Sequence, residues 1–522
     1  MAVGQDGWRE TCLERAGAAV GILLCVVGIY IQFAVGATVT WRDHALVQFR
    51  HPFYGLLLVL AGIAIRWCLS PTYRKRCEQN ARSDRSRVLD YASGGRWVPW
   101  RAAFCWVFFP ALLVYQSNDR TLGWGDSVPM LQTAVSLLVD GDLALDEFTD
   151  PDHPPYYVCR INGHYYSGYN LGPVLIALPF VQVCRWLGGD LLDSAMRRRF
   201  EKVIASVVAA ASALLMFCVF LRMSRPAAAV VLTIVYALGS QVWSTASQAL
   251  WQHGPVALSV SAILMIEYHS KHRPSWRLTI VQGVMLGFAA ACRPTAAILG
   301  AAFAGLVLWR RRRHLGALLA GGVLAYLPFG LIHLTVYQSV LGPYQRFAAA
   351  GVWAHDSLTG LAGTLVSPAR GLLVYQPWVV PAIATAFHRF RRRIDSGLSL
   401  ALGGWCIVHL LLVSHFGMWW GGHCWGPRYL TDLMPALVVL AAPVVEGLWS
   451  YSAGRICAIV LIAWSVALQA TGAYSREAIR WNAVPADVDH SPQRVWEWND
   501  APFLRPWKGP PRLLPSKISE RC

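Results

Sequence analysis

The chain has 522 residues, of which 55% are hydrophobic (AVILMFWYC) and 14% are charged, and its mean hydropathy is +0.39. Soluble globular proteins carry about 25% charged residues. The composition therefore excludes a disordered, collagen-like or disulfide-stapled chain and predicts an all-α polytopic membrane protein. The 46 Lys and Arg outnumber the 29 Asp and Glu and give a net charge of +17. Cytoplasmic loops of membrane proteins carry such an excess, so we expect no nucleic-acid partner.

Apolar segments recur along most of the chain. A transmembrane helix needs about 20 mostly apolar residues, and several of these segments are shorter, so their limits are approximate. In chain order the candidate segments are 16–36, 53–70, 102–117, 171–188, 203–221, 226–242, 255–270, 278–292, 295–309, 315–335, 371–388, 397–414, 431–448 and 454–472.

The charges of the loops predict the orientation, because basic loops stay in the cytoplasm. Segment 71–101 holds eight basic residues against three acids, whereas 118–165 is strongly acidic. We therefore expect 71–101 to lie inside and 118–165 outside. The arginine runs at 310–313 and 389–393 are then expected inside.

Counting the crossings shows that one apolar segment does not span the membrane. Six segments separate the acidic outer loop from the arginine run at 310–313, yet opposite sides require an odd number of crossings. We choose 171–188, because Pro173 and Pro179 interrupt it, as a helix that lies at the outer interface or dips in and returns. This leaves about 13 transmembrane helices, with the N-terminus cytoplasmic.

The chain divides into three parts on this interpretation. Residues 1–100 form two N-terminal transmembrane helices and a basic cytoplasmic loop, and residues 101–472 form the transmembrane region that carries the candidate site. Residues 473–522, rich in Pro and Trp, form an extracytoplasmic tail that packs on the surface. The outer loops of the middle part are 118–202, 336–370 and 415–430.

The first outer loop carries several carboxylates around a short amphipathic helix. Asp126 comes just before this helix and Asp142 just after it, and Asp146 and Glu147 follow. Asp126 is our candidate for acid–base chemistry, and the other three acids are secondary candidates. The alternative is that Asp126 caps the helix and that the others are solvated loop charges.

Aromatic and histidine side chains also gather at the expected outer ends of the spans. Tyr166 and Tyr169 could form a platform for a sugar or an interfacial aromatic belt. His253, Trp420 and His423 are further candidates for sugar or acceptor binding. For His253 the alternative is a hydrogen-bonded structural role.

Two arginines lie at the mouths of expected spans beside Gly and Pro turns. Arg370 and Arg428 suit a phosphate, because a guanidinium binds phosphate in a bidentate manner. An arginine at the membrane usually has an anionic partner. The alternative is therefore that Asp356 or Asp432 pairs with these arginines and leaves nothing for a ligand.

The first outer loop resembles that of the GT-C superfamily of integral-membrane glycosyltransferases, such as bacterial protein O-mannosyltransferases and lipid A aminoarabinose transferases. The matching residues are Gly125-Asp126, Ala134, Leu137, Leu138 and Gly141-Asp142. Segments 165–173, 367–371 and 420–429 also resemble bacterial members, and the likeness covers most of residues 100–510. The sequence departs at Ser127, where those families commonly carry a second acid.

The resemblance implies a hexosyl- or pentosyltransferase in the plasma (inner) membrane, with its active site on the extracytoplasmic face. It would move a sugar from a polyprenyl-phosphate-linked donor to a glycan, lipid or protein acceptor, with inversion. Asp126 would be the general base and Arg428 and Arg370 would bind the donor phosphate. Tyr166, Tyr169, His253, Trp420 and His423 would hold the sugar or the acceptor.

Two rival functions and one cofactor question stay open. A transporter or flippase for a lipid-linked saccharide would use charges along a path at mid-membrane, and a saccharide polymerase or ligase could also use outer arginines. A lone Asp126 argues against a two-carboxylate metal site, because hard divalent ions prefer several oxygen ligands. Asp142, Asp146 or His164 could supply them, so a divalent cation is a candidate cofactor.

Overall fold

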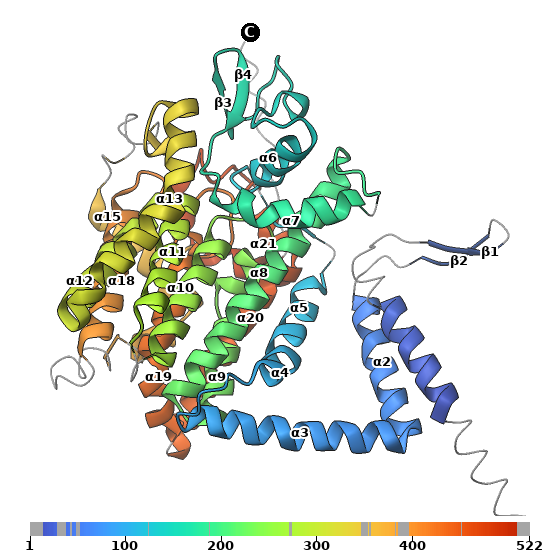
Figure 1. The fold of residues 1–522 in the computed structure, drawn as a ribbon. Coiled ribbons are helices and arrows are strands. Elements are labelled where there is room, and N and C mark those ends of the chain that lie inside the picture. Colours follow the sequence, from blue (N-terminus) through green and yellow to red (C-terminus); the bar gives the residue numbers. More distant parts are fainter. Residues whose placement is uncertain are drawn as a thin grey trace, which may run out of the picture.

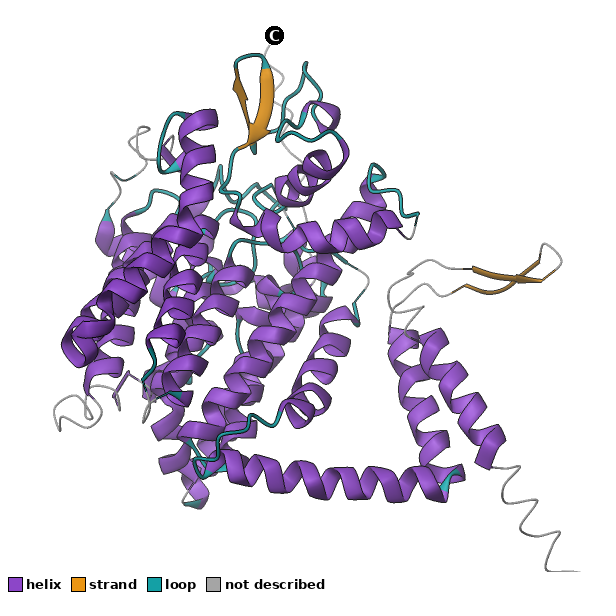
Figure 2. Ribbon diagram, viewed as in Figure 1, coloured by secondary structure: helices purple, strands orange, loops and turns teal. Residues whose placement is uncertain are grey.

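The fold was examined in a computed structural model (Figure 1). The residues that it describes are 14–28, 38–41, 44–48, 53–118, 120–123, 125–186, 188–270, 274–345, 353, 356–381, 383–384, 396–449 and 451–508. The arginine run expected inside at 389–393 falls outside these residues. Helices dominate the described part, as predicted (Figure 2).

Two short antiparallel hairpins are the strands of the described part, and the sequence analysis expected neither. β1 (Thr38–Trp41) pairs with β2 (His44–Gln48), and β3 (Val158–Ile161) pairs with β4 (His164–Ser167). The turn of the second hairpin is Asn162-Gly163, and both residues have positive φ, 51° and 93°. Asn-Gly is the favoured pair for such a two-residue turn.

The basic segment after the second expected span is largely a helix rather than a loop. A helix over residues 14–28 and α2 (Phe53–Leu69) precede α3 (Pro71–Ala92), which runs across one end of the molecule (Figure 1). Ser70 begins α3, since its Oγ accepts a hydrogen bond from the amide of Tyr73 at 3.1 Å. Proline at the first helical position suits this start.

The remaining chain forms one bundle of helices with short helical turns between them. Its longer helices are α5 (Phe109–Gln116), α6 (Val128–Val139), α7 (Gly172–Trp186), α8 (Ser194–Met223), α9 (Pro226–Ala237), α10 (His253–His269), α11 (Trp276–Cys292), α12 (Ala297–Arg311), α13 (Leu315–Tyr337), α15 (Ser357–Val366), α18 (Ser396–His415), α19 (Met434–Trp449) and α20 (Ser452–Tyr474). The shorter ones are α4 (Trp100–Ala103), α16 (Leu372–Tyr375), α21 (Arg476–Arg480) and α22 (Arg505–Lys508).

Helix α8 forms the centre of the bundle. Asp193 caps its N-terminus by accepting a hydrogen bond from the amide of Met196 at 2.7 Å. The helix then packs against α5, α9 and α10, and most of its side chains between Ile204 and Leu221 are buried. Its N-terminal turns carry Glu201 and Lys202, which belong to the candidate site.

Glycines let two neighbouring helices, α11 and α13, approach closely. A Cβ atom at Gly283 of α11 would lie 2.1 Å from the carbonyl oxygen of Leu318, and one at Gly321 of α13 would lie 2.3 Å from that of Ile280. Helices in membranes associate through such small residues, because lipid offers no hydrophobic drive to bring them together.

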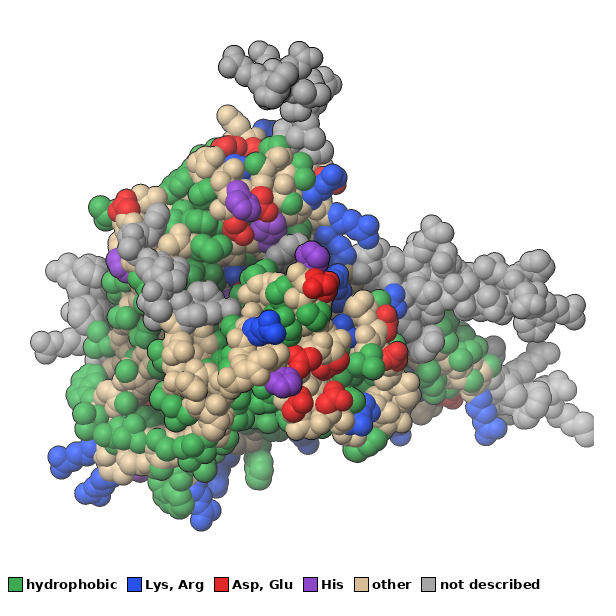
Figure 3. Space-filling view, turned by 90° about the horizontal axis from the view of Figure 1, so that it is seen from above, with side chains coloured by type: hydrophobic (Ala, Val, Ile, Leu, Met, Phe, Trp, Pro, Cys, Tyr) green, Lys and Arg blue, Asp and Glu red, His purple; other side chains and the backbone are tan. Residues whose placement is uncertain are grey.

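The two ends of the bundle differ in character. β3, β4, α6 and α7 lie at the end opposite α3, and α7 runs across the ends of the other helices (Figure 1). Seen onto that end, acidic and histidine side chains gather on the surface (Figure 3). We call it the polar end; it is the end that the loop charges predict to be extracytoplasmic.

Five helical segments of the described part are long and apolar enough to cross a membrane: 194–223, 294–337, 397–415, 428–449 and 452–474. The predicted number of 13 stays a prediction. The expected segment 226–242 divides into α9 and a π-helical turn (Val242–Ala246). The expected segment 371–388 begins with the four-residue helix α16, and part of that segment lies outside the described residues.

Candidate active site

Asp126, from the expected outer loop 118–202, forms an ion pair with Arg428, from the expected outer loop 415–430. Arg428 Nη1 lies 2.9 Å from Asp126 Oδ2, and the Arg428 side chain is 5% exposed while that of Asp126 is 23% exposed. The Arg428 guanidinium also lies over the ring of Trp251, 4.4 Å from its centroid. Neither of the two acids expected as alternative partners, Asp356 and Asp432, makes this ion pair.

Hydrogen bonds donated by the side chains of Lys202 and Asn118 hold the loop that carries Asp126. Lys202 Nζ donates to the carbonyl oxygens of Asn118 and Arg120 at 2.9 and 2.8 Å. Asn118 Nδ2 donates to Gln248 Oε1 at 2.7 Å and to the carbonyl oxygen of Ala473 at 2.9 Å. A buried lysine with two carbonyl partners is satisfied within the protein, so Lys202 acts here as a brace for the loop.

Glu201, the neighbour of Lys202, braces the same region from the other side. Its Oε1 accepts a hydrogen bond from the amide of Leu250 at 3.0 Å, and Ser127 donates to its carboxylate. Ser127 follows Asp126, and Leu250 precedes Trp251. One buried carboxylate therefore positions residues on both sides of Arg428.

A second buried network holds the backbone around Arg428. Asp432 lies in the same 3-10 turn, Arg428–Leu433, and its Oδ2 is 2.6 Å from Arg293 Nη1. Its Oδ1 is 2.8 Å from His253 Nδ1, and His409 Nε2 is 3.0 Å from the carbonyl oxygen of Tyr429. His253, which the sequence offered as a sugar ligand, is therefore a buried member of this network.

Among the described residues Arg370 has no anionic partner, and its guanidinium is bound mainly by carbonyl oxygens. Its side chain donates to the backbone oxygens of Ala369, Trp420 and Gly422 at 3.0, 2.7 and 3.0 Å, and to Asn482 Oδ1 at 2.6 Å. The residue is 2% exposed. These hydrogen bonds hold the 420–424 loop to the segment after α20. The donors of Arg370 are therefore occupied and do not suit the phosphate role that the sequence suggested.

The two tyrosines expected as a sugar platform have different surroundings. Tyr169 is buried beside Tyr344, with ring centroids 6.3 Å apart, and Tyr344 donates to Gln252 Oε1 at 2.6 Å. Burial, and next the charge of Asp126, raise the pKa of the Tyr169 phenol. Tyr166 instead stacks edge-on against Tyr337 on α13, 6.5 Å away. Of these two tyrosines, Tyr169 is the one whose phenol responds to the charge of Asp126.

The three secondary acids lie on the exposed loop after α6. Asp142 Oδ1 accepts hydrogen bonds from Ser136 Oγ and the amide of Ala144, both at 3.0 Å. Asp146 Oδ2 lies 2.6 Å from His164 Nδ1, and burial raises the pKa of Glu147. These contacts match the alternative of loop charges, and Asp142, Asp146 and His164 do not come together with Asp126.

Trp420 and His423 contact the C-terminal segment rather than Asp126. Trp420 Nε1 donates to Asp489 Oδ1 at 2.9 Å, and His423 Nε2 lies 2.8 Å from Asp487 Oδ2. From the sequence, the tail was expected to pack on the surface, and neither Asp487 nor Asp489 was a candidate site residue. Their only local signal is the run Asp487-Val-Asp489-His490, which resembles any solvated turn.

A cavity of about 270 Å³ adjoins the Asp126–Arg428 pair. It is lined by helix ends and loops, and the charged side chains among the described residues of its lining are Arg198, Arg428 and Arg480, with no carboxylate among them. The lining is Thr121, Leu122, Gly123, Arg198, Ser244, Thr245, Trp251, His423, Cys424, Trp425, Arg428, Ile479, Arg480, Asn482 and Ala483. The lining therefore favours an anionic ligand.

Several lining residues carry polar atoms that are buried without a hydrogen-bond partner. Among the described residues, Arg428 Nε, Trp251 Nε1 and Trp425 Nε1 are N–H donors of this kind, and Thr245 Oγ1 is a fourth such atom. A buried donor without a partner costs about 1–3 kcal/mol. Three such donors around one cavity suit a ligand rich in acceptor oxygens, such as a phosphate.

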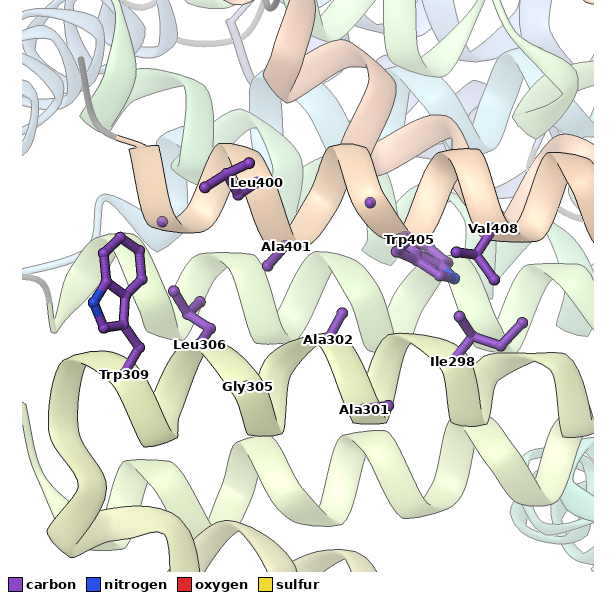
Figure 4. A pocket seen from close by; sticks show the side chains of 12 residues that line it. Ile298, Ala301, Ala302, Gly305, Leu306, Trp309, Leu400, Ala401, Trp405 and Val408 are labelled. Carbon is purple, nitrogen blue, oxygen red and sulfur yellow. The ribbon is translucent and has the colours of Figure 1, made fainter. Parts of the chain in front are cut away.

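A second hollow, of about 430 Å³, lies between α12 and α18. Leu306, Trp309 and Ile298 of α12 face Leu400 and Trp405 of α18 across it (Figure 4). Its lining holds no charged side chain among the residues that the structure describes.

Comparisons with known proteins identify only distant structural likeness. No family model matches the sequence and no curated protein matches it. The archaeal oligosaccharyltransferase of Archaeoglobus fulgidus, tethered to an acceptor peptide, is similar with a TM-score of 0.48 and 12% identity over 76% of this chain and 59% of that one. The archaeal oligosaccharyltransferase AglB from Archaeoglobus fulgidus, in complex with an inhibitory peptide and a dolichol-phosphate, gives a TM-score of 0.45 and 12% identity over 78% of this chain and 61% of that one. This chain spans about three fifths of the length of each of these proteins.

Proposed function

We propose that this protein is a membrane glycosyltransferase that moves a sugar from a polyprenyl-phosphate-linked donor to an acceptor on the extracytoplasmic face. The observation that carries the proposal is the ion pair of Asp126 and Arg428 beside a cavity lined by arginines and unpartnered N–H donors. A carboxylate next to an anion-binding cavity supplies both groups that such a transfer needs.

In the proposed reaction the hydroxyl oxygen of the acceptor attacks the anomeric carbon of the sugar. Asp126 accepts the hydroxyl proton, because a hydroxyl is a weak nucleophile without a base. The bond between the anomeric carbon and the phosphate oxygen breaks, and the lipid phosphate leaves with the electron pair. Arg428 stabilises the charge that develops on this phosphate, and the configuration inverts.

In this mechanism the ion pair of Asp126 and Arg428 is the arrangement before the donor binds. A carboxylate oxygen that is bound to Arg428 is less available to the hydroxyl of an acceptor, because the guanidinium occupies it. A donor phosphate competes for Arg428 through its partnerless Nε and draws the guanidinium from Asp126. Donor binding would thus release the base at the moment when the leaving group is in place.

The location of these groups favours a transferase over the rival functions. Asp126, Arg428 and the cavity lie among helix ends and loops, whereas a transporter needs charged groups along a path at mid-membrane. A polymerase or ligase would share the arginines but has no requirement for the early carboxylate. The acceptor therefore decides between these enzyme classes, and it can be a protein, a lipid or a glycan.

The test is sugar transfer in proteoliposomes from a panel of radiolabelled polyprenyl-phosphate sugars. Asp126→Asn should bind donor and lose turnover by about 10²–10⁴-fold, the usual contribution of a positioned base. Asp152→Asn, on the exposed loop, is the matched control and should keep full activity. Equal activity of Asp126→Asn and wild type would overturn the proposed mechanism. Movement of labelled lipid across the bilayer without transfer would instead indicate a transporter.

A further inference from the structure

His423, Asp487 and Asp489 form a compact group of metal-ligating side chains apart from the Asp126–Arg428 pair. One ligand atom from each lies within 4.8 Å of the others. His423 Nε2 is 2.8 Å from Asp487 Oδ2 and 4.0 Å from Asp489 Oδ2. The histidine belongs to the 420–424 loop and the acids to the segment after α21, so the group joins two separate parts of the polar end.

We propose that this group binds a divalent first-row transition cation such as Mn²⁺ or Zn²⁺. One imidazole nitrogen and two carboxylate oxygens form a mixed donor set of the kind that these ions accept. Three protein ligands leave further positions for water or for an oxygen of a ligand. The inference concerns cation binding and is independent of the proposed sugar transfer.

The local charge supports a cation. Two carboxylates face one imidazole, so carboxylate oxygens outnumber the nitrogen donor in this group. Two neighbouring groups contact these acids: Trp420 Nε1, which is uncharged, donates to Asp489 Oδ1, and His490 Nδ1 lies 3.5 Å from Asp487 Oδ1 on the exposed side. A divalent cation would neutralise the two carboxylates.

The position of His423 supplies a second reason to expect a bound ion. His423 also lines the cavity that contains the partnerless donors of Arg428 and Trp425. An anion held by those donors would lie near the open positions of the cation. A cation bound to His423 would therefore lie beside the cavity next to Arg428, whose other polar groups favour an anion.

Cation binding can be measured directly on the purified, metal-free protein without any sugar donor. Titration with Mn²⁺ followed by electron paramagnetic resonance should show one bound ion. Asp487→Asn, Asp489→Asn and His423→Gln should each weaken binding by about tenfold or more. Asp150→Asn is the control, because Asp150 and His153 form an exposed pair at 3.6 Å that belongs to no group of three such ligands among the described residues.

Thermal unfolding in the same samples separates cation binding from damage to the fold. Mn²⁺ should raise the unfolding temperature of the wild type and of Asp150→Asn but not of Asp487→Asn, and chelation should reverse the shift. If Asp487→Asn does not fold, His423→Gln gives the same comparison with both acids intact. Absence of Mn²⁺ and Zn²⁺ binding to the wild type, or unchanged binding in the three variants, would overturn the proposal. Loss of sugar transfer by Asp126→Asn would leave this result unaffected.

Discussion

Glu201 accepts a hydrogen bond from the backbone amide of Leu250 at 3.0 Å and so links the start of α8 to the segment that carries Trp251. The same carboxylate accepts a hydrogen bond from Ser127, the neighbour of Asp126. The two faces of the candidate site, the carboxylate side and the arginine side, thus share one buried anchor.

We expect Glu201→Ala to disturb the candidate site indirectly, because Glu201 binds the residues next to Asp126 and Trp251. The variant leaves a backbone amide and a hydroxyl without their acceptor, at about 1–3 kcal/mol for each buried group. Glu201→Gln keeps one acceptor oxygen and should lose less than half as much. The measurement is the unfolding temperature in detergent together with kcat. A fall in donor affinity alone, with unchanged stability, would argue against this positioning role.

A double-mutant cycle tests whether Asp126 and Arg428 act as a unit. Arg428→Gln should reduce transfer by about 10²–10³-fold through loss of phosphate stabilisation, and it should also raise the donor KM. Combining it with Asp126→Asn should cost far less than the product of the single effects, because both changes remove one coupled pair. Strictly multiplicative losses would show that the two residues work independently. Initial rates at several donor concentrations provide the data.

The same assay distinguishes Arg370 from Arg428. Arg370→Gln removes most of the donors that hold carbonyl oxygens of the 420–424 loop, so we expect a fall of several degrees in the unfolding temperature. The fraction that remains folded at low temperature should bind donor with a nearly unchanged KM. Arg428→Gln should show the opposite pattern. A rise in the donor KM of Arg370→Gln to the level of Arg428→Gln would return Arg370 to the phosphate site.

Asp146 predicts a pH dependence of the exposed loop. Partial burial raises the pKa of Asp146, but the hydrogen bonds from His164 and from the amide of Tyr165 outweigh burial, so its pKa lies below the ordinary value. A lowered pKa adds stability above the ordinary carboxyl pKa of about 4, and this stability is lost as the pH falls through the native pKa. Asp146→Asn should therefore unfold slightly earlier than wild type at pH 7, by less than about 1 kcal/mol for so exposed a pair.

Unfolding curves between pH 7 and pH 3 check this expectation. The difference between Asp146→Asn and wild type should shrink as the pH decreases. A difference that stays constant over that range would exclude the ion pair as its cause. Asp152→Asn, on the same loop, should follow the wild type throughout.

The sequence predicted the helical fold class well, because a long apolar helix is visible in composition alone. It also singled out Asp126 and Arg428, since each is a charged residue beside a turn at the expected outer side. It could not predict which arginine meets which acid: Arg370 and Arg428 have similar local sequences, and only tertiary packing gives one a carboxylate and the other carbonyl oxygens. Asp487 and Asp489 were missed for the same reason, because their partner lies on another loop.

The lining of the cavity has a consequence for how the protein is made. It begins with Thr121 and is completed by Asn482 and Ala483, which follow α20. The ribosome synthesises these residues after α20. Nearly all helices of the bundle therefore precede the last residues of the cavity lining during synthesis. Most of the chain is therefore synthesised before the cavity can be complete.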